Sequence, residues 1–287
     1  MPATITDDER QTYQSRGYLL LDSAIDATWI ERINTTIDDL IDQSRSAAPD
    51  DWRFDTEPDH SADTPRLRRI NSPVDVDPLF EEFSLDGPAT DIAEAILGPD
   101  VRFHHSKLNI KWHGGGEEVK WHQDIAFWPH TDFSPLTIGV YLRDVDDEMG
   151  PMGVVPTSHT GELFDLTTVD GAWSGTIRDE DLHRVNIDDA DYLTGPAGSV
   201  TVHNCCAVHG SRPNQSDRMR PLLLQTYSRA DSYPLLGVGT NGLGSRRAHQ
   251  VVRGSAPEHL EVDGRRLPTA PDWYRNSYTS IFDVQQR

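Results

Sequence analysis

The sequence predicts a mainly β fold, a sandwich or barrel with helices packed outside it, and three observations support this. Short strand patterns separated by clusters of Gly, Pro, Asp and Asn fill most of the chain after residue 100. Helical periodicity is concentrated in the first 98 residues. The chain has neither βαβ alternation nor a glycine-rich nucleotide loop after a strand, which disfavours a doubly wound fold.

The elements follow in order along the chain. Residues 6–15 predict a short polar helix, and residues 17–21 (GYLLL) predict a buried strand. An amphipathic helix is expected over residues 26–44, because its apolar residues recur at helical spacing, and it should lie on the outside of a sheet. Asp and Pro residues predict a long loop over 47–66, and a short helix at 89–97 should end at Gly98. Strands are then expected at 101–112, 117–124, 136–143, 152–155, 199–203 and 220–228.

Length and charge restrict the classes of function. The 287 residues are long enough for a sizeable core, and we expect one domain over 1–287, with a helical part at about 1–98 and the β core at about 99–287. The net charge of -21 disfavours nucleic-acid and anionic membrane partners. Neither a signal peptide nor a membrane span is expected, and the two adjacent cysteines, Cys205 and Cys206, do not build a disulfide framework. A cytoplasmic location is the expectation that follows.

A His-x-Asp pair in a predicted strand is the first candidate for chemistry. His122 and Asp124 are two residues apart, so strand alternation would place both side chains on one face. With a second imidazole from a distant strand, for which His209 is the candidate, they would form the facial triad of two histidines and one carboxylate that leaves positions open on Fe(II). His130 and Asp132 repeat the pattern, but the prolines around them predict a turn.

An arginine follows the candidate third ligand. Arg220 lies eleven residues after His209, on the next predicted strand, and a β-hairpin would bring both into one pocket. A guanidinium held there can bind a carboxylate through two parallel hydrogen bonds, as an organic-acid cosubstrate requires. We expect the competitor Arg218 to point away from this pocket. A tetrahedral zinc site would give no reason for this arginine.

Three ordered segments carry a family resemblance. His122-Gln-Asp124, residues 150–159 (GPMGVVPTSH) and residues 209–220 (HGSRPNQSDRMR) together resemble the phytanoyl-CoA dioxygenase family of Fe(II)- and 2-oxoglutarate-dependent oxygenases. The pattern of a helix, a GYLLL strand and an amphipathic helix near the amino terminus is similar to that family too. The resemblance therefore covers most of the chain.

The resemblance implies a fold and a set of site residues. The fold is a double-stranded β-helix, the cupin-like jelly roll, with helices on one outer side. His122, Asp124 and His209 would hold iron, Arg220 would bind the distal carboxylate of 2-oxoglutarate, and Ser211 would assist that arginine. By their placement, Asn109 and Trp128 are similar to residues of the ectoine hydroxylase branch that contact cosubstrate and substrate, although the segment after Trp128 is short for that branch.

Other candidate residues have a structural reading beside a functional one. Phe127 and Trp128 form part of a possible aromatic wall facing the substrate, but aromatic side chains in strands commonly fill a core. Tyr141 either contacts a ligand or fills a gap in packing. The glycines of 114–116 and the segment 235–244 are candidates for a loop that covers the site.

The expected activity is hydroxylation of an aliphatic C–H bond in a small metabolite or natural-product intermediate. The cofactors would be Fe(II), 2-oxoglutarate and O2, and the coproducts succinate and CO2. Asp124 argues against halogenation, because related halogenases replace this carboxylate with a small residue. Two alternatives stay open: the same iron site catalysing desaturation, epoxidation or cyclisation, and a non-catalytic jelly roll that only binds a metal.

Overall fold

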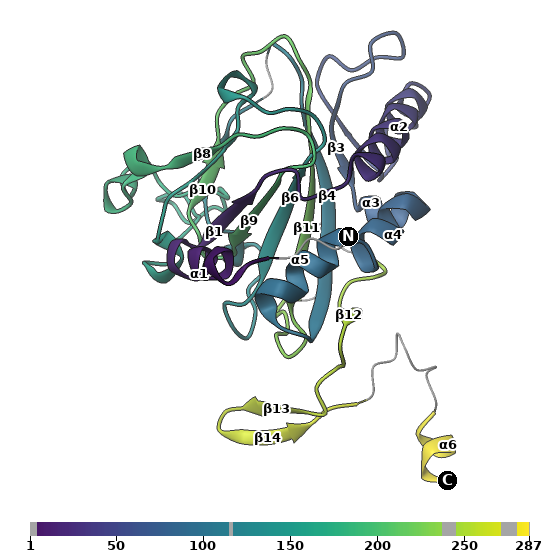
Figure 1. The fold of residues 1–287 in the computed structure, drawn as a ribbon, viewed down its shortest axis with the longest axis vertical. Helices are drawn as coiled ribbons and strands as arrows, with labels where there is room; N and C mark the ends of the chain where they lie inside the picture. Colours follow the sequence, from purple (N-terminus) through teal and green to yellow (C-terminus); the bar gives the residue numbers. More distant parts are fainter. Residues whose placement is uncertain (1–4, 115–116, 237–244, 271–279, 287) are drawn as a thin grey trace.

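A computed structural model describes residues 5–114, 117–236, 245–270 and 280–286. Figure 1 shows two β-sheets facing each other, with helices covering the outer side of the larger one. The β-hairpin and the short helix near the carboxyl terminus lie apart from this body in the same view. The arrangement is a jelly roll, as the family resemblance implied.

The larger sheet runs in the order β1-β9-β6-β11-β4-β3-β2, with β12 also paired to β4. Its central strands are long and buried, and they are antiparallel to their neighbours. The strands of this sheet are β1 (Tyr18–Leu21), β2 (Phe54–Thr56), β3 (Leu67–Asn71), β4 (Val101–Lys111), β6 (Leu136–Tyr141), β9 (Val200–Asn204), β11 (Arg220–Arg229) and β12 (Val251–Arg253).

The smaller sheet has the order β5-β10-β7-β8. Its strands are β5 (Val119–His122), β7 (Met152–Val154), β8 (Asp191–Leu193) and β10 (His209–Ser211), and β13 (His259–Val262) pairs only with β14 (Arg265–Pro268). Five single turns of 3-10 helix lie in the connections: η1 (Asp124–Ala126), η2 (Asp147–Met149), η3 (Ser158–Thr160), η4 (Leu182–Arg184) and η5 (Ile187–Asp189).

The helices of the amino-terminal part pack against the larger sheet. They are α1 (Asp7–Arg16), α2 (Ala27–Ser44), α3 (Pro73–Val76), α4 (Pro78–Leu85) and α5 (Pro88–Leu97), and α6 (Ile281–Gln285) lies near the carboxyl terminus. Asp26 caps α2 by accepting a hydrogen bond from the backbone N–H of Thr28 at 2.8 Å. The apolar face of α2, with Ile33 and Ile37 fully buried, joins the core between helices and sheet. Among the described residues, no helix has both the length and the apolar character needed to cross a bilayer.

Several elements before residue 88 differ from the sequence-based expectations. The predicted loop at 47–66 contains the edge strand β2, whose Phe54 is buried in the core. In the amino-terminal part, β1 confirms the strand predicted at 17–21, whereas strand β3 and helices α3 and α4 were not predicted. Short edge strands carry few periodic apolar residues, so their sequence patterns are weak.

Candidate metal and cosubstrate site

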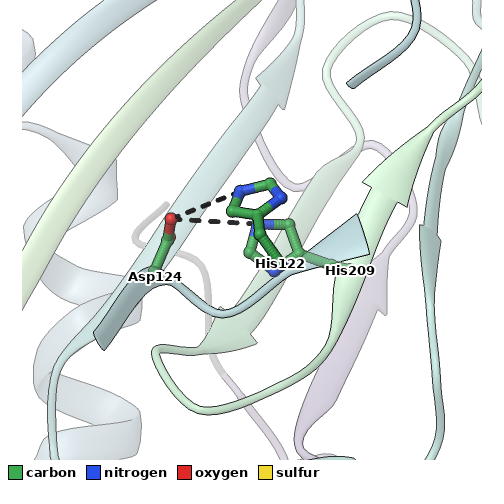
Figure 2. Close-up of side chains that lie close together, drawn as sticks. All are labelled: His122, Asp124 and His209. Atoms are coloured by element: carbon green, nitrogen blue, oxygen red, sulfur yellow. Dashed lines mark ion pairs between the residues drawn. The ribbon is translucent and has the colours of Figure 1, made fainter. Parts of the chain in front are cut away.

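His122, Asp124 and His209 meet in the space between the two sheets (Figure 2). Each offers one ligand atom, and these atoms all lie within 4.8 Å of one another. The Asp124 Oδ1 atom lies 3.7 Å from the Nε2 atom of His122 and 3.9 Å from that of His209. Two imidazoles and one carboxylate at this spacing are the donor set of the facial triad, so the residues fit an Fe(II) ion.

The two histidines converge because they are direct neighbours across paired strands. His209 of β10 lies opposite His122 of β5 in antiparallel register, and their ring centroids are 4.2 Å apart. The Nδ1 atom of each ring lies within hydrogen-bonding distance of the backbone carbonyl two residues earlier, at 2.8 Å for His122 and 3.0 Å for His209. This contact orients each ring and leaves Nε2 free to bind a metal.

Asp124 reaches the site by a different route from the predicted one. We expected it to share a strand face with His122, but β5 ends at His122 and Asp124 begins the 3-10 turn η1. The backbone N–H of Phe127 bonds to the carbonyl of Asp124 at 2.9 Å, and that of Ile125 to the carbonyl of Cys205 at 2.9 Å. These bonds anchor the turn against the loop before β10 and aim the carboxylate back at the histidines.

The second carboxylate oxygen of Asp124 is held from the opposite side. His203 of β9 places its Nε2 atom 3.3 Å from Oδ2, and the Thr137 hydroxyl donates to the same atom at 3.3 Å. Neither His203 nor Thr137 was predicted as a site residue. Their inward positions on predicted strands were the available signal, because side chains at alternating positions of a core strand share a face.

The protonation states suit metal binding. Burial lowers the pKa of His122 and of His209, and so keeps both imidazoles in the neutral form that ligates metals. Burial by itself would raise the pKa of Asp124, but the imidazoles of His209 and His203 and the ammonium of Lys107 hold it well below its ordinary value. The carboxylate therefore stays ionised.

Arg220 supplies an anion-binding group in the same cavity. It is 2% exposed, and its Nε and Nη1 atoms are buried without a hydrogen-bond partner in the described residues. Burial lowers its pKa to about 10, so it is still charged at neutral pH. Unsatisfied buried donors carry a large free-energy cost, and a carboxylate is the group that satisfies two of them at once. Arg218 points outward to a salt bridge with Asp146. Strand alternation does not explain this, because residues two apart on a strand share a face; Arg218 precedes β11, which begins at Arg220.

Arg220 and His209 do not lie on one hairpin, which corrects our expectation. His209 is on β10 of the smaller sheet, while Arg220 begins β11 of the larger sheet opposite Lys111 of β4. The two sheets of the jelly roll bring them into one cavity. Lys111 donates from Nζ to the Ser211 hydroxyl at 2.8 Å, so Ser211 contacts a lysine that the sequence analysis had not identified.

The cavity has a volume of about 180 Å³ and contains most of the predicted site. The triad, Asn109, Ser211 and Arg220 all line it. Apolar side chains and further charged residues complete the lining: Ile110, Val119, Met152, Leu222, Leu224, Glu57, Arg68, Arg69, Lys107, Lys111, Glu117 and Glu118.

The three predicted substrate contacts, Phe127, Trp128 and Tyr141, are not among the described residues that line this cavity. Trp128 is 3% exposed and packs against His104, His105 and His130, and the Tyr141 hydroxyl donates to the backbone carbonyl of Leu193. Neither is among the described residues that line the cavity, because both are absorbed into packing. Phe127 meets His122 edge to face at 5.7 Å, outside the lining.

The candidate covering loops are only partly described. Residues 115–116 and 237–244, which belong to them, lie outside the described residues.

Comparisons with known proteins agree with this geometry. Residues 13–222 match the family model described as phytanoyl-CoA dioxygenase. A probable alpha-ketoglutarate-dependent hypophosphite dioxygenase of Stutzerimonas stutzeri is 32% identical over 242 residues, covering 82% of each chain. An L-proline trans-4-hydroxylase of Streptomyces griseoviridis is 33% identical over 56% of this chain and 67% of its own length. EctD from S. alaskensis, solved with 2-oxoglutarate and 5-hydroxyectoine, superposes with a TM-score of 0.70 at 24% identity, covering 87% of this chain and 86% of that one. The chain therefore belongs to the phytanoyl-CoA dioxygenase family and is an Fe(II)- and 2-oxoglutarate-dependent dioxygenase.

Proposed function

We propose that this dioxygenase hydroxylates an aliphatic C–H bond of a small metabolite or natural-product intermediate. In this proposal His122, Asp124 and His209 hold Fe(II), which with 2-oxoglutarate and O2 supplies the oxidising chemistry and yields succinate and CO2. The observation that carries the proposal is the convergence of the triad with the unsatisfied guanidinium of Arg220 in one cavity.

The protein residues bind and orient in this scheme. His122, Asp124 and His209 would hold the ion, and a triad of this composition would leave coordination positions for exogenous ligands. Arg220 binds the distal carboxylate of 2-oxoglutarate, with Lys111 and Ser211 beside it and Asn109 lining the same wall. Leu222 and Leu224 supply an apolar wall that excludes water from the space where the substrate lies.

The dimensions of the cavity support a small substrate. Its volume of about 180 Å³ is below the roughly 300 Å³ at which pockets for drug-sized ligands begin. The relatives named for hypophosphite and L-proline act on small molecules too.

The proposed location is cytoplasmic, which is consistent with the free thiols of Cys205 and Cys206.

The first experiment adds Fe(II) and then 2-oxoglutarate to the purified protein without oxygen and records the visible charge-transfer band of a chelated keto acid. We expect a band that is lost in His209→Ala and that needs at least tenfold more 2-oxoglutarate in Arg220→Ala, because a charge-assisted bond is removed. Arg218→Ala is the matched control and should titrate like the wild type, since its side chain points outward.

The outcomes separate the alternatives. Iron binding with no band would contradict the proposal and favour a non-catalytic metal-binding jelly roll. With the band present, succinate release identifies substrates after oxygen is admitted. The product mass then distinguishes hydroxylation, which adds one oxygen atom, from desaturation, which removes two hydrogen atoms, while its structure identifies epoxidation or cyclisation.

A further inference from the structure

The distribution of lysine is unusual in this chain. The sequence has only three lysines, Lys107, Lys111 and Lys120, in a protein with a net charge of -21. Lys107 and Lys111 line the cavity, whereas Lys120 is exposed on strand β5 of the smaller sheet. An ammonium group removed from water is costly unless an anion compensates it. Lys107 and Lys111 are therefore expected to have anionic partners.

The cationic side chains of the cavity fall into two groups along β4. Lys111 lies opposite Arg220 of β11, while Lys107 lies opposite Leu224, about 13 Å further along at roughly 3.3 Å per residue. The charge of Arg220 acts on Lys111, and the charge of Arg69 acts on Lys107. Arg220 and Lys111 are assigned to the cosubstrate, which leaves Lys107 and Arg69 without a role.

Lys107 and Arg69 lie on adjacent strands, and the acidic charges that act on them, Asp124 on Lys107 and Asp55 on Arg69, form no salt bridge with them. Strand β3 pairs with β4 so that Arg69 is opposite Asn109 and Asn71 is opposite Lys107. The Arg69 Nε atom donates to the neutral Asn109 side chain at 3.0 Å. In the described part of the chain, no salt bridge joins Lys107 or Arg69 to a carboxylate, whereas the adjacent Arg68 pairs with Glu57 at 3.0 Å.

Lys107 is also the cation that acts on the triad. Its charge lowers the pKa of Asp124 and of His122. The Asp124 carboxylate is thus the negative charge that offsets Lys107 in the free protein, and a metal ion bound at Asp124 takes up that charge. In an iron-loaded site Lys107 would lose this offset, and Lys107 and Arg69 would face the cavity with no carboxylate in a salt bridge to either of them among the described residues.

We propose that Lys107 and Arg69 bind an anionic group of the substrate, a carboxylate or a phosphorus oxyanion, next to the iron position. This inference rests on the proposed function, because it assigns the substrate class of the same site. The planar guanidinium fork matches both kinds of oxyanion, and the ammonium adds a point charge. Ile110, Leu222 and Leu224 would contact the aliphatic part. The substrate class is therefore small aliphatic acids.

The test uses the protein loaded with Fe(II) and 2-oxoglutarate without oxygen, and two probe anions with neutral counterparts of the same shape. Isothermal titration calorimetry measures binding of methylphosphonate against methanesulfonamide, and of acetate against acetamide. We expect binding of at least one anion and of neither neutral compound. Lys107→Met should weaken anion binding at least tenfold, about 1.4 kcal/mol, and Lys107→Arg should retain most of it.

Two controls assign the effect to the substrate side of the site. Lys120→Met makes the same change at the exposed lysine and should leave anion binding unchanged. The 2-oxoglutarate affinity, measured from the visible band, should be unchanged in Lys107→Met. Adding the probe compounds should not remove the visible band. The melting temperature of each variant reports whether the fold is intact.

Several results would overturn the inference. In the wild type, these results are equal binding of anions and neutral compounds, or no binding of either anion. In Lys107→Met, they are unchanged anion binding, or a loss of 2-oxoglutarate affinity as large as the loss of anion affinity. The last result would place Lys107 in the cosubstrate site. If the wild-type protein shows no visible band, the proposed function itself is contradicted. The failure of the proposed function can therefore be distinguished from the failure of this inference.

Discussion

Asp124 is the residue on which the geometry of the site depends most, because both of its carboxylate oxygens are used. Oδ1 faces the two ligand histidines, while Oδ2 contacts His203 and Thr137. Partners of this kind fix the orientation of a ligand and tune its affinity for metal. His203 is therefore a positioning residue, and its effect should be measurable on iron binding alone.

Replacing His203 by Leu should weaken Fe(II) binding by about 10- to 100-fold, because Oδ2 loses a contact that holds the carboxylate in place. The measurement is an anaerobic Fe(II) titration followed by competition with a chelator. Thr201→Val, on the same strand, is the control, since its hydroxyl contacts only the Gly139 carbonyl at 3.4 Å. Equal iron affinity in wild type and His203→Leu would show that Thr137 alone is sufficient.

The strands and helices determine where these residues lie, and their predictability differs with length. Long elements such as α2 and β11 were predicted within about one residue of their observed bounds, because many apolar positions repeat along them. Among the three-residue strands, β7 was predicted at 152–155 and β10 only as the strand that carries His209, whereas β2, β8 and β12 were not predicted, because three positions are too few to show a periodicity. The 3-10 turn that carries Asp124 was not predicted either. This turn is anchored by the hydrogen bond from the Ile125 N–H to the carbonyl of Cys205, a residue far away in the sequence.

Helix α2 should contribute strongly to stability through its buried face. Ile37 is 0% exposed in the core between helices and sheet, so Ile37→Ala should lower the free energy of unfolding by about 2–5 kcal/mol through lost burial and the cavity left behind. Chemical denaturation by urea measures the change. Asp39→Ala, on the exposed face of the same helix, should change it by about 0.5 kcal/mol or less. Similar effects of the two substitutions would contradict this packing.

At the scale of the whole molecule, a buried cluster of histidines beside the site links stability to pH. The Nδ1 atoms of His104 and His105 are 2.6 Å apart. The ring centroids of His130 and His249 lie 5.0 Å and 6.1 Å from the ring centroid of His104. Burial lowers the pKa of all four, to about 3 for His105 and about 4 for His249. The folded protein therefore holds these rings neutral.

This cluster predicts acid lability of the metal-free protein. The unfolded chain binds protons on these histidines near pH 6.5 and the folded protein only at lower pH, so stability is fully present above about 6.5 and falls as the pH decreases toward 4. Each such proton contributes a slope of about 1.4 kcal/mol per pH unit. Melting temperatures between pH 7.5 and 4.5 test this, and His249→Gln should flatten the curve, whereas the exposed His183→Gln should not. A melting temperature independent of pH would contradict the prediction.

The sequence by itself determined the fold class and the family. It also provided the candidates for the three metal ligands and for the arginine that binds the cosubstrate, because periodicity and ordered motifs are local properties of the chain. Only the tertiary structure decided how these residues meet. Pairing of β5 with β10 places His122 beside His209, and the facing of two sheets places Arg220 opposite them. Lys107 and Arg69 become neighbours only through the pairing of β3 with β4. These relations depend on contacts between residues far apart in the sequence, which no local pattern records.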